Sequence, residues 1–150
     1  MRTFEHLAEL QPLVGQDIAI SDWVLVDQKR IDQFAEATGD HQWIHVDPAR
    51  AAAGPFGTTV AHGFLTLSLL PEMSASAFQV SDTRMGVNYG LNRVRFPAPV
   101  PSGSRLRGHF KLISYEPIEG GAQVVMEVTM ECEGGKKPVC VAESVARRYV

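Results

Sequence analysis

Cysteine is scarce in this sequence, and neither sign of charge dominates. The 150 residues include two cysteines, 14 basic residues and 17 acidic residues, for a formal net charge of −3. Nucleic-acid-binding proteins usually carry a strong basic excess, so this charge balance argues against that class of function. Two cysteines are also too few for a four-cysteine zinc site.

The two cysteines leave one structural question open. Cys132 and Cys140 lie on either side of the Gly134-Gly135 pair, and a short turn there would set them opposite each other. A disulfide bond is therefore geometrically allowed. Cytosolic thiols stay reduced, however, and nothing in the sequence marks the protein as exported. We expect free thiols.

Long hydrophobic runs are absent as well. The longest mostly apolar stretch, residues 60–71, is interrupted by His62, Thr66 and Ser68, whereas a membrane-spanning helix needs about 20 apolar residues. The N-terminus has neither an apolar run nor a small-residue cleavage site, so it does not resemble a signal peptide. We therefore expect a cytoplasmic protein without a membrane anchor. Its length suits a single domain over residues 1–150.

The first half of the chain predicts several helices. Apolar residues 18–26 favour one strand or two short strands. Asp27 is then a suitable N-cap for the helix that follows, and Gly39 fits the left-handed position just past the end of that helix. Asp47 indicates the start of a second, short helix over Pro48–Ala53.

The longest expected helix covers His62–Phe78. Its apolar residues are spread over most of the helix circumference, which is typical of a helix buried in the core. Pro71 lacks the amide hydrogen that a helix interior needs, so it should kink this helix or end its first part.

From about residue 84 onward the sequence predicts strands. Apolar and polar residues alternate over residues 105–112 and again over residues 124–133, which is typical of half-buried antiparallel strands. The outer faces of these two strands carry opposite charges, which predicts cross-strand ion pairs. The residues expected to pair are Arg107, Lys111, Glu127 and Glu131.

A last strand is expected over Lys137–Tyr149. One long helix wrapped by an antiparallel sheet of five or six strands would be an α+β fold. The edges of such a sheet stay unpaired in a single chain, so pairing with a second copy is expected.

Residues 38–47 hold the densest group of polar side chains. Asp40 and His45 are five positions apart, and a turn would bring both to one shared water. A carboxylate and an imidazole on one water form a proton-transfer pair. Two alternatives stay open at this point. Asp40 could cap a turn beside a core histidine, or His41, His45 and Asp47 could bind zinc, although they lack a helical pair of ligands.

The start of the expected central helix is a second candidate element. The first N–H groups of a helix have no partner within it and lie at its positive end. If they point into a cavity, these groups can stabilise a developing oxyanion, and Gly63 lets a substrate approach the backbone closely. The alternatives are a glycine required by crowding and, for His62, a structural contact in place of a catalytic role.

Residues 88–100 are a third candidate element. Strand alternation puts Tyr89, Leu91, Arg93 and Arg95 on one face, and either arginine could contact a phosphate. The plainer interpretation is a solvated strand face.

Three blocks of the sequence resemble the MaoC-like dehydratase family, the (R)-specific enoyl-CoA hydratases. They are Phe34–Asp47 (FAEATGDHQWIHVD), Ala61–Leu70 (AHGFLTLSLL) and Asn92–Val100 (NRVRFPAPV). The most specific feature is a glycine followed by Asp40, four residues and His45. The resemblance is strongest to the nodulation-protein-N-like, single-domain branch.

This resemblance implies a hot-dog fold, in which the sheet wraps around the central helix, and a homodimer with a continuous sheet. It implies that Asp40 and His45 are the catalytic pair and that the Gly63 N–H binds the thioester oxygen. The substrate would be a trans-2-enoyl-CoA, hydrated to (R)-3-hydroxyacyl-CoA without metal or cofactor. The family usually has Asn-Pro between the catalytic residues, where this sequence has Gln42-Trp43. This departure is expected to affect the shape of the acyl pocket.

Two other functions fit the same fold. Thioester hydrolysis usually employs a carboxylate on the central helix, where Glu72 is the only acid. Glu72 lies nine residues after Gly63, about two and a half helical turns away. A non-catalytic hot-dog protein would bind acyl chains or protein partners without turning them over.

Overall fold

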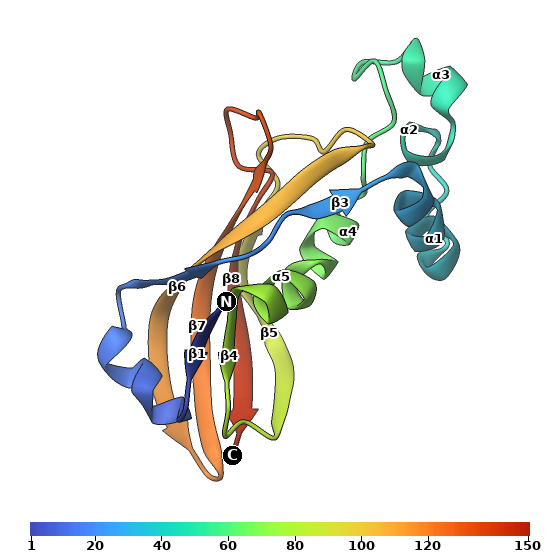
Figure 1. Cartoon of the computed structure of the whole chain (residues 1–150). Coiled ribbons are helices and arrows are strands. Elements are labelled where there is room, and N and C mark those ends of the chain that lie inside the picture. Colours follow the sequence, from blue (N-terminus) through green and yellow to red (C-terminus); the bar gives the residue numbers. More distant parts are fainter.

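A six-stranded antiparallel sheet is the main feature of the structure, a computed structural model that describes all of residues 1–150 (Figure 1). Its strands follow the order β2-β6-β7-β8-β5, and β3 also pairs with β6. Their bounds are β2 (Asp17–Ile20), β3 (Val24–Val26), β5 (Met85–Arg95), β6 (Ser104–Ile118), β7 (Gly121–Cys132) and β8 (Cys140–Tyr149). The sheet curves around the central helical segment (Figure 1). The expected α+β arrangement is confirmed.

Strands β6 and β7 pair in the register that the charge pattern predicts. Arg107 lies opposite Glu131, and Lys111 lies opposite Glu127. The Arg107 guanidinium donates to the Glu131 carboxylate, so this expected ion pair is confirmed. Lys111 forms no ion pair with Glu127, although the two residues are neighbours across the strands.

The central helical segment has the break that Pro71 predicts. Helix α4 (Gly63–Ser68) is followed by α5 (Leu70–Ala77), which has Pro71 in its first turn. A proline there removes no helical hydrogen bond. The expectation of a helix buried on all sides is wrong, because the chain has no element that covers the outer face of α4, and Phe64 is 71% exposed. A single stripe packs in the core, formed by Leu65, Leu69, Met73 and Ala77.

The N-terminal residues form elements that the sequence patterns do not predict. Strand β1 (Arg2–Phe4) pairs in parallel with β4 (Phe78–Val80), and the 3-10 helix η1 (Leu7–Leu13) follows β1. Phe78 therefore belongs to a strand, and the central helix ends before it. Strands of three residues are too short for alternation to be detected.

Three short helices lie beyond one end of the sheet (Figure 1). Helix α1 (Gln28–Thr38) has the Asp27 carboxylate as its N-cap and ends at Gly39, whose φ of 78° is left-handed, as expected. Helix α3 (Pro48–Ala52) also starts at the expected place. Between them, α2 (Trp43–Val46) adds one helical turn that the sequence does not predict.

Strand β5 forms one edge of the sheet and is irregular. Its pairing with β8 shifts register at two bulges, which interrupt strict alternation. Leu91 therefore pairs with Ser144, and Arg93 pairs with Glu143. Because adjacent residues of β8 face opposite sides of the sheet, Leu91 and Arg93 do not share a face, and that expectation is wrong.

Strand β8 begins at Cys140, later than the expected start at Lys137. Cys132 and Cys140 are both free thiols, and Cys140 lies opposite Met130 in the register. Burial raises the pKa of the Cys140 thiol to about 11.

None of the helices combines the length and the hydropathy that crossing a bilayer requires.

Candidate active site

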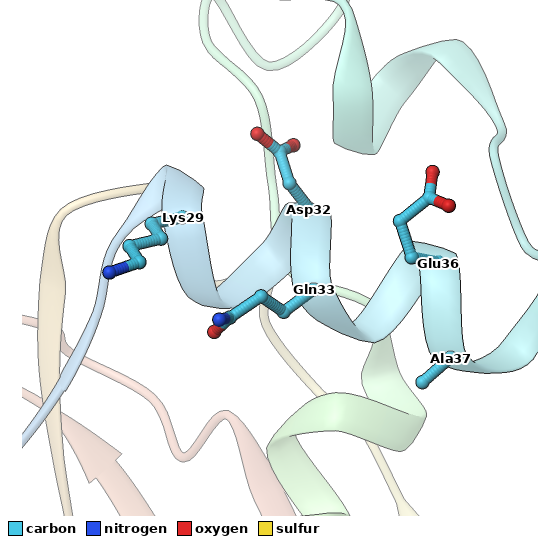
Figure 2. Close-up of a pocket in the computed structure, with 5 residues that line it drawn as sticks. All are labelled: Lys29, Asp32, Gln33, Glu36 and Ala37. Atoms are coloured by element: carbon cyan, nitrogen blue, oxygen red, sulfur yellow. The ribbon is translucent and has the colours of Figure 1, made fainter.

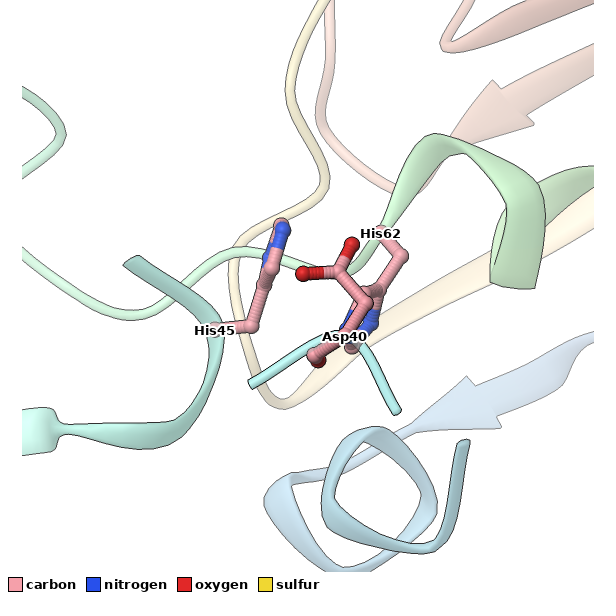
Figure 3. A group of neighbouring side chains, drawn as sticks. All are labelled: Asp40, His45 and His62. Carbon is pink, nitrogen blue, oxygen red and sulfur yellow. The ribbon is translucent and has the colours of Figure 1, made fainter. Parts of the chain in front are cut away.

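Asp40, His45 and His62 meet between α2 and the start of α4 (Figure 3). One potential ligand atom of each side chain lies within 4.8 Å of the corresponding atoms of the other two. Figure 3 shows the Asp40 carboxylate pointing toward the His45 ring. The structure therefore brings the expected pair together and adds His62, which lies 22 positions after Asp40 in the chain.

Helix α2 explains how Asp40 and His45 come close. An extended chain of five residues spans up to about 17 Å, whereas a helical residue advances the chain by only about 1.5 Å. Gly39 ends α1 in a left-handed conformation, and the single turn of α2 then folds His45 back toward Asp40. Two local features thus place the pair at one point.

Backbone contacts fix the orientation of the His45 ring, which is only 7% exposed. Its Nδ1–H donates to the Val60 carbonyl at 2.6 Å. The Val60 N–H in turn donates to the Ile44 carbonyl, and the Gln28 side-chain amide donates to the His45 carbonyl at 2.7 Å. Because Nδ1 carries the hydrogen, Nε2 holds a lone pair that can accept a proton. Gln28 has no sequence signal for this role, since its partner lies 17 positions away.

Asp40 is exposed to solvent, and its carboxylate accepts a hydrogen bond from the Gln42 N–H at 3.3 Å. A water that hydrogen-bonds to two groups, at about 2.8 Å from each, bridges a gap of up to about 5.6 Å. The separation of at most 4.8 Å between the Asp40 and His45 atoms is compatible with one shared water.

Trp43 lies against α3. The Arg50 guanidinium stacks over its ring at 4.4 Å, and a Cβ on Gly54 would come within 3.0 Å of that ring. Because Gly54 has no side chain, it leaves room for the Trp43 ring. Gly54 does not belong to the Asp40–His45 pair. The departure at Gln42-Trp43 therefore leaves the pair intact.

Gly63 is the first residue of α4 and lines a cavity of about 280 Å³. Its N–H has no acceptor within its own helix. A Cβ at this position would lie 3.1 Å from the Phe96 ring. The crowding alternative for this glycine therefore has direct structural support. Crowding at the Cα is compatible with the oxyanion role, because the Gly63 N–H makes no backbone hydrogen bond.

The zinc alternative, His41 with His45 and Asp47, does not assemble in the structure. His41 faces Glu36 at 3.6 Å, and the Asp47 carboxylate caps α3 by accepting from the Arg50 N–H. The group that does assemble also fits a metal ion poorly. The His45 and His62 rings are stacked, with centroids 3.8 Å apart and planes 24° apart. A metal ion bound by imidazole lies near the ring plane, and two stacked rings do not share such a position.

Arg93 and Arg95 lie around a separate hollow of about 360 Å³ that also contains Glu127 and Glu143. Two carboxylates next to the arginines disfavour a phosphate there. The structure supports the plainer interpretation of a solvated strand face.

Two further hollows lie near the helices. One, of about 720 Å³, runs along α1, and Figure 2 shows that its lining residues, Lys29 to Ala37, all come from that single helix. The other, of about 610 Å³, lies between the central helices and strands β5 and β8. Half of its lining residues are apolar, among them Leu67, Ala75 and Leu91. The first residue that lines this hollow, Leu67, lies about one helical turn after Gly63.

Glu72, the acid on which the hydrolysis alternative depends, is engaged elsewhere. Its carboxylate accepts from the Arg30 guanidinium at 2.8 Å, and its side chain is 52% exposed. It therefore forms a surface ion pair between α5 and α1.

Comparisons with known proteins place the chain in a family. Residues 9–136 match the family described as MaoC like domain. The 3-hydroxyacyl-thioester dehydratase Z of Mycobacterium tuberculosis is 54% identical over 148 residues, with 98% of each chain covered. Nodulation protein N of Rhizobium leguminosarum bv. viciae is 49% identical over 140 residues, which are 91% of this chain and 86% of that protein.

Solved structures share the fold at lower identity. An R-hydratase from Pseudomonas aeruginosa has a TM-score of 0.77 at 24% identity, over 97% of this chain and 86% of that one. An (R)-hydratase from A. caviae has a TM-score of 0.71 at 22% identity, over 89% and 94% of the two chains. The expected hot-dog fold is confirmed. From the match over residues 9–136 and the relatives of similar length, the chain belongs to the MaoC-like dehydratase family.

Proposed function

We propose that the protein reversibly hydrates trans-2-enoyl-CoA to (R)-3-hydroxyacyl-CoA. The observation that carries this proposal is the pairing of the Asp40 carboxylate with the His45 imidazole, close enough to hold one water at the start of α4. A relative that is 54% identical and bears the name 3-hydroxyacyl-thioester dehydratase supports the reaction class.

The proposed mechanism begins with the thioester carbonyl at the Gly63 N–H. This hydrogen bond draws electron density from the C2–C3 double bond and makes C3 electrophilic. Asp40 and His45 hold the water, and His45 Nε2 can take its proton as the oxygen attacks C3. The pair then delivers a proton to C2. Water and proton reach the substrate from one face, which would fix the configuration of the product.

The acyl chain is proposed to occupy the hollow of about 610 Å³ between the central helices and strands β5 and β8. Apolar residues line half of it, and burial of apolar surface favours a hydrocarbon chain by about 0.8 kcal/mol per methylene. Leu67, which lines this hollow, lies four residues after Gly63, about one helical turn along α4.

A homodimer is proposed on the basis of the β5 edge. Strand β5 pairs with β8 on one side only. Its side chains are largely exposed, including Met85 at 53% and Tyr89 at 58%. An unpaired edge with apolar side chains is suited to pairing with another strand.

We also propose, from the sequence, that the protein is cytoplasmic and that residues 1–150 form a single domain.

The decisive experiment is an assay of the purified protein with crotonyl-CoA. We expect loss of the enoyl absorbance, and chiral analysis should identify (R)-3-hydroxybutyryl-CoA as the product. Release of free CoA thiol without hydration would instead indicate a thioesterase. Saturable binding of acyl-CoA with no turnover at any chain length would indicate a non-catalytic acyl-binding protein.

A further inference from the structure

His62 contacts both members of the proposed catalytic pair. Its Nε2–H donates to the main-chain carbonyl of Asp40 at 2.9 Å. One face of its ring stacks on the His45 ring, with centroids 3.8 Å apart. The Phe34 ring lies 4.9 Å from it at a tilt of 54°. His62 is 2% exposed, so these contacts are shielded from solvent.

The second ring nitrogen of His62, Nδ1, indicates that packing alone does not explain why a histidine occupies this position. Nδ1 is buried and has no hydrogen-bond partner. A buried polar atom without a partner destabilises the folded state. A phenylalanine would fill the same space and stack on His45 without that cost. What phenylalanine cannot supply is the Nε2–H that holds the Asp40 carbonyl.

We propose that His62 is a positioning residue that sets the geometry of the Asp40–His45 pair. Its donor nitrogen fixes the backbone that carries the Asp40 carboxylate, while its ring face fixes the plane of His45. Together these contacts set the gap in which the water is held. Because His62 directly precedes Gly63, the same residue also ties the water-holding pair to the amide proposed to bind the thioester oxygen. This inference rests on the proposed function.

Two substitutions separate the two contacts. His62→Gln keeps an N–H donor for the Asp40 carbonyl but removes the stacked ring. His62→Phe keeps a flat ring against His45 but removes the donor and the unpartnered nitrogen. Displacement of a catalytic group by about 1 Å can cost about 10²-fold in rate. We expect kcat to fall about 10- to 100-fold in each variant, with KM within about threefold of wild type.

Stability distinguishes positioning from a merely structural role. His62→Phe loses the buried unpartnered atom but also the hydrogen bond to the Asp40 carbonyl. Because these two changes oppose each other, the variant should melt near the wild-type temperature and yet have a lower kcat. The exposed residue His41 provides the control, because His41→Gln should leave both quantities unchanged. Wild-type kcat in folded His62→Phe would overturn the proposal. If His62→Phe does not fold, a wild-type kcat in His62→Gln would overturn the proposal instead.

Nuclear magnetic resonance of histidine-labelled protein tests the same geometry without a substrate. The ring current of His62 should shift the carbon-bound protons of the His45 ring upfield. His62→Gln should abolish this shift, and His62→Phe should preserve it. A wild-type His45 without the shift would refute the positioning role even if hydration is observed. A wild type that shows the shift but hydrates no enoyl thioester would refute the proposed function and leave the stacking intact.

Discussion

At the scale of single residues, hydrogen bonds to the backbone decide what each site residue can do. The Val60 carbonyl accepts from His45 Nδ1–H, which leaves Nε2 as the ring nitrogen that holds a lone pair. Asp40 is exposed while His45 is nearly buried. One group can therefore exchange with solvent, while the other is held in a fixed tautomer and orientation.

If Asp40 and His45 transfer protons as proposed, a substitution that prevents this in either residue should slow hydration without unfolding the protein. Asp40→Asn and His45→Gln are each expected to lower kcat for crotonyl-CoA about 10²- to 10⁴-fold. Melting temperature by circular dichroism verifies the fold, and His41→Gln serves as the matched control for a neighbouring histidine. Near-normal rates in both folded variants would remove this pair from the mechanism.

At the scale of elements, α5 forms one wall of the proposed acyl cavity. Ala75 on α5 lines the hollow of about 610 Å³. Ala75→Phe should exclude several methylenes, each worth about 0.8 kcal/mol of burial. We therefore expect kcat/KM for a long-chain enoyl-CoA to fall at least about tenfold, with little change for crotonyl-CoA.

A second Ala→Phe exchange provides the control for chain length. Ala37 lies on α1, in the hollow formed by that helix alone (Figure 2). Ala37→Phe should leave the kcat/KM ratio of long to short substrates unchanged. Equal effects of Ala75→Phe on both chain lengths would place the acyl chain elsewhere.

The pairing of β6 and β7 predicts a pH-dependent contribution to stability. Hydrogen bonds from His109 and Arg107 hold the pKa of Glu131 below its ordinary value of 4.5. A carboxyl group whose pKa is lower in the folded state stabilises the protein fully above the unfolded value, and this stabilisation is lost as the pH falls through the folded pKa. The side chain is 38% exposed, so solvent screening limits the contribution to less than about 1 kcal/mol.

Glu131→Gln tests this contribution by chemical denaturation over a range of pH. The variant should be less stable than wild type at pH 7, and the difference should shrink as the pH falls below 4. Glu127→Gln is the matched control, because Glu127 lies opposite Lys111 without an ion pair. A difference for Glu131→Gln that is constant with pH would rule out the carboxylate as its cause.

At the scale of the whole molecule, one sheet edge and the outer face of α4 are left uncovered. Strand β5 has no partner beyond β8, and Phe64 on α4 is 71% exposed. Both surfaces would be buried if a second copy extended the sheet. Symmetric pairing puts the same residue on both sides of such an interface.

A charge placed on this edge should separate the two copies. Val87 on β5 is 40% exposed, and Val14, which lies outside the sheet, is 43% exposed. Analytical ultracentrifugation of the wild type at micromolar concentration should give the mass of a dimer. Val87→Lys should shift the mass toward the monomer, because pairing of the edges would bring a charged side chain into the interface. Val14→Lys should leave the mass at that of a dimer. A wild-type protein with the mass of a monomer would contradict the proposed homodimer.

Local patterns were sufficient to predict several elements and the pair of site residues. The Asp27 and Asp47 caps, the end of α1 at Gly39 and the break near Pro71 each depend on a few neighbouring residues. Alternation likewise predicted the β6–β7 pairing. The Asp40–His45 spacing suggested a shared water because both residues lie in one short segment.

What only the tertiary structure decided depends on residues far apart in the chain. The parallel β1–β4 pair, the bulges of β5 and the exposed face of α4 have no local pattern. The same holds for His62, whose partner Asp40 lies 22 positions away. Periodicity and capping report the preferences of neighbouring residues. The stacking of His62 on His45, by contrast, exists only after separate segments have packed together, so it could be found only in the folded chain.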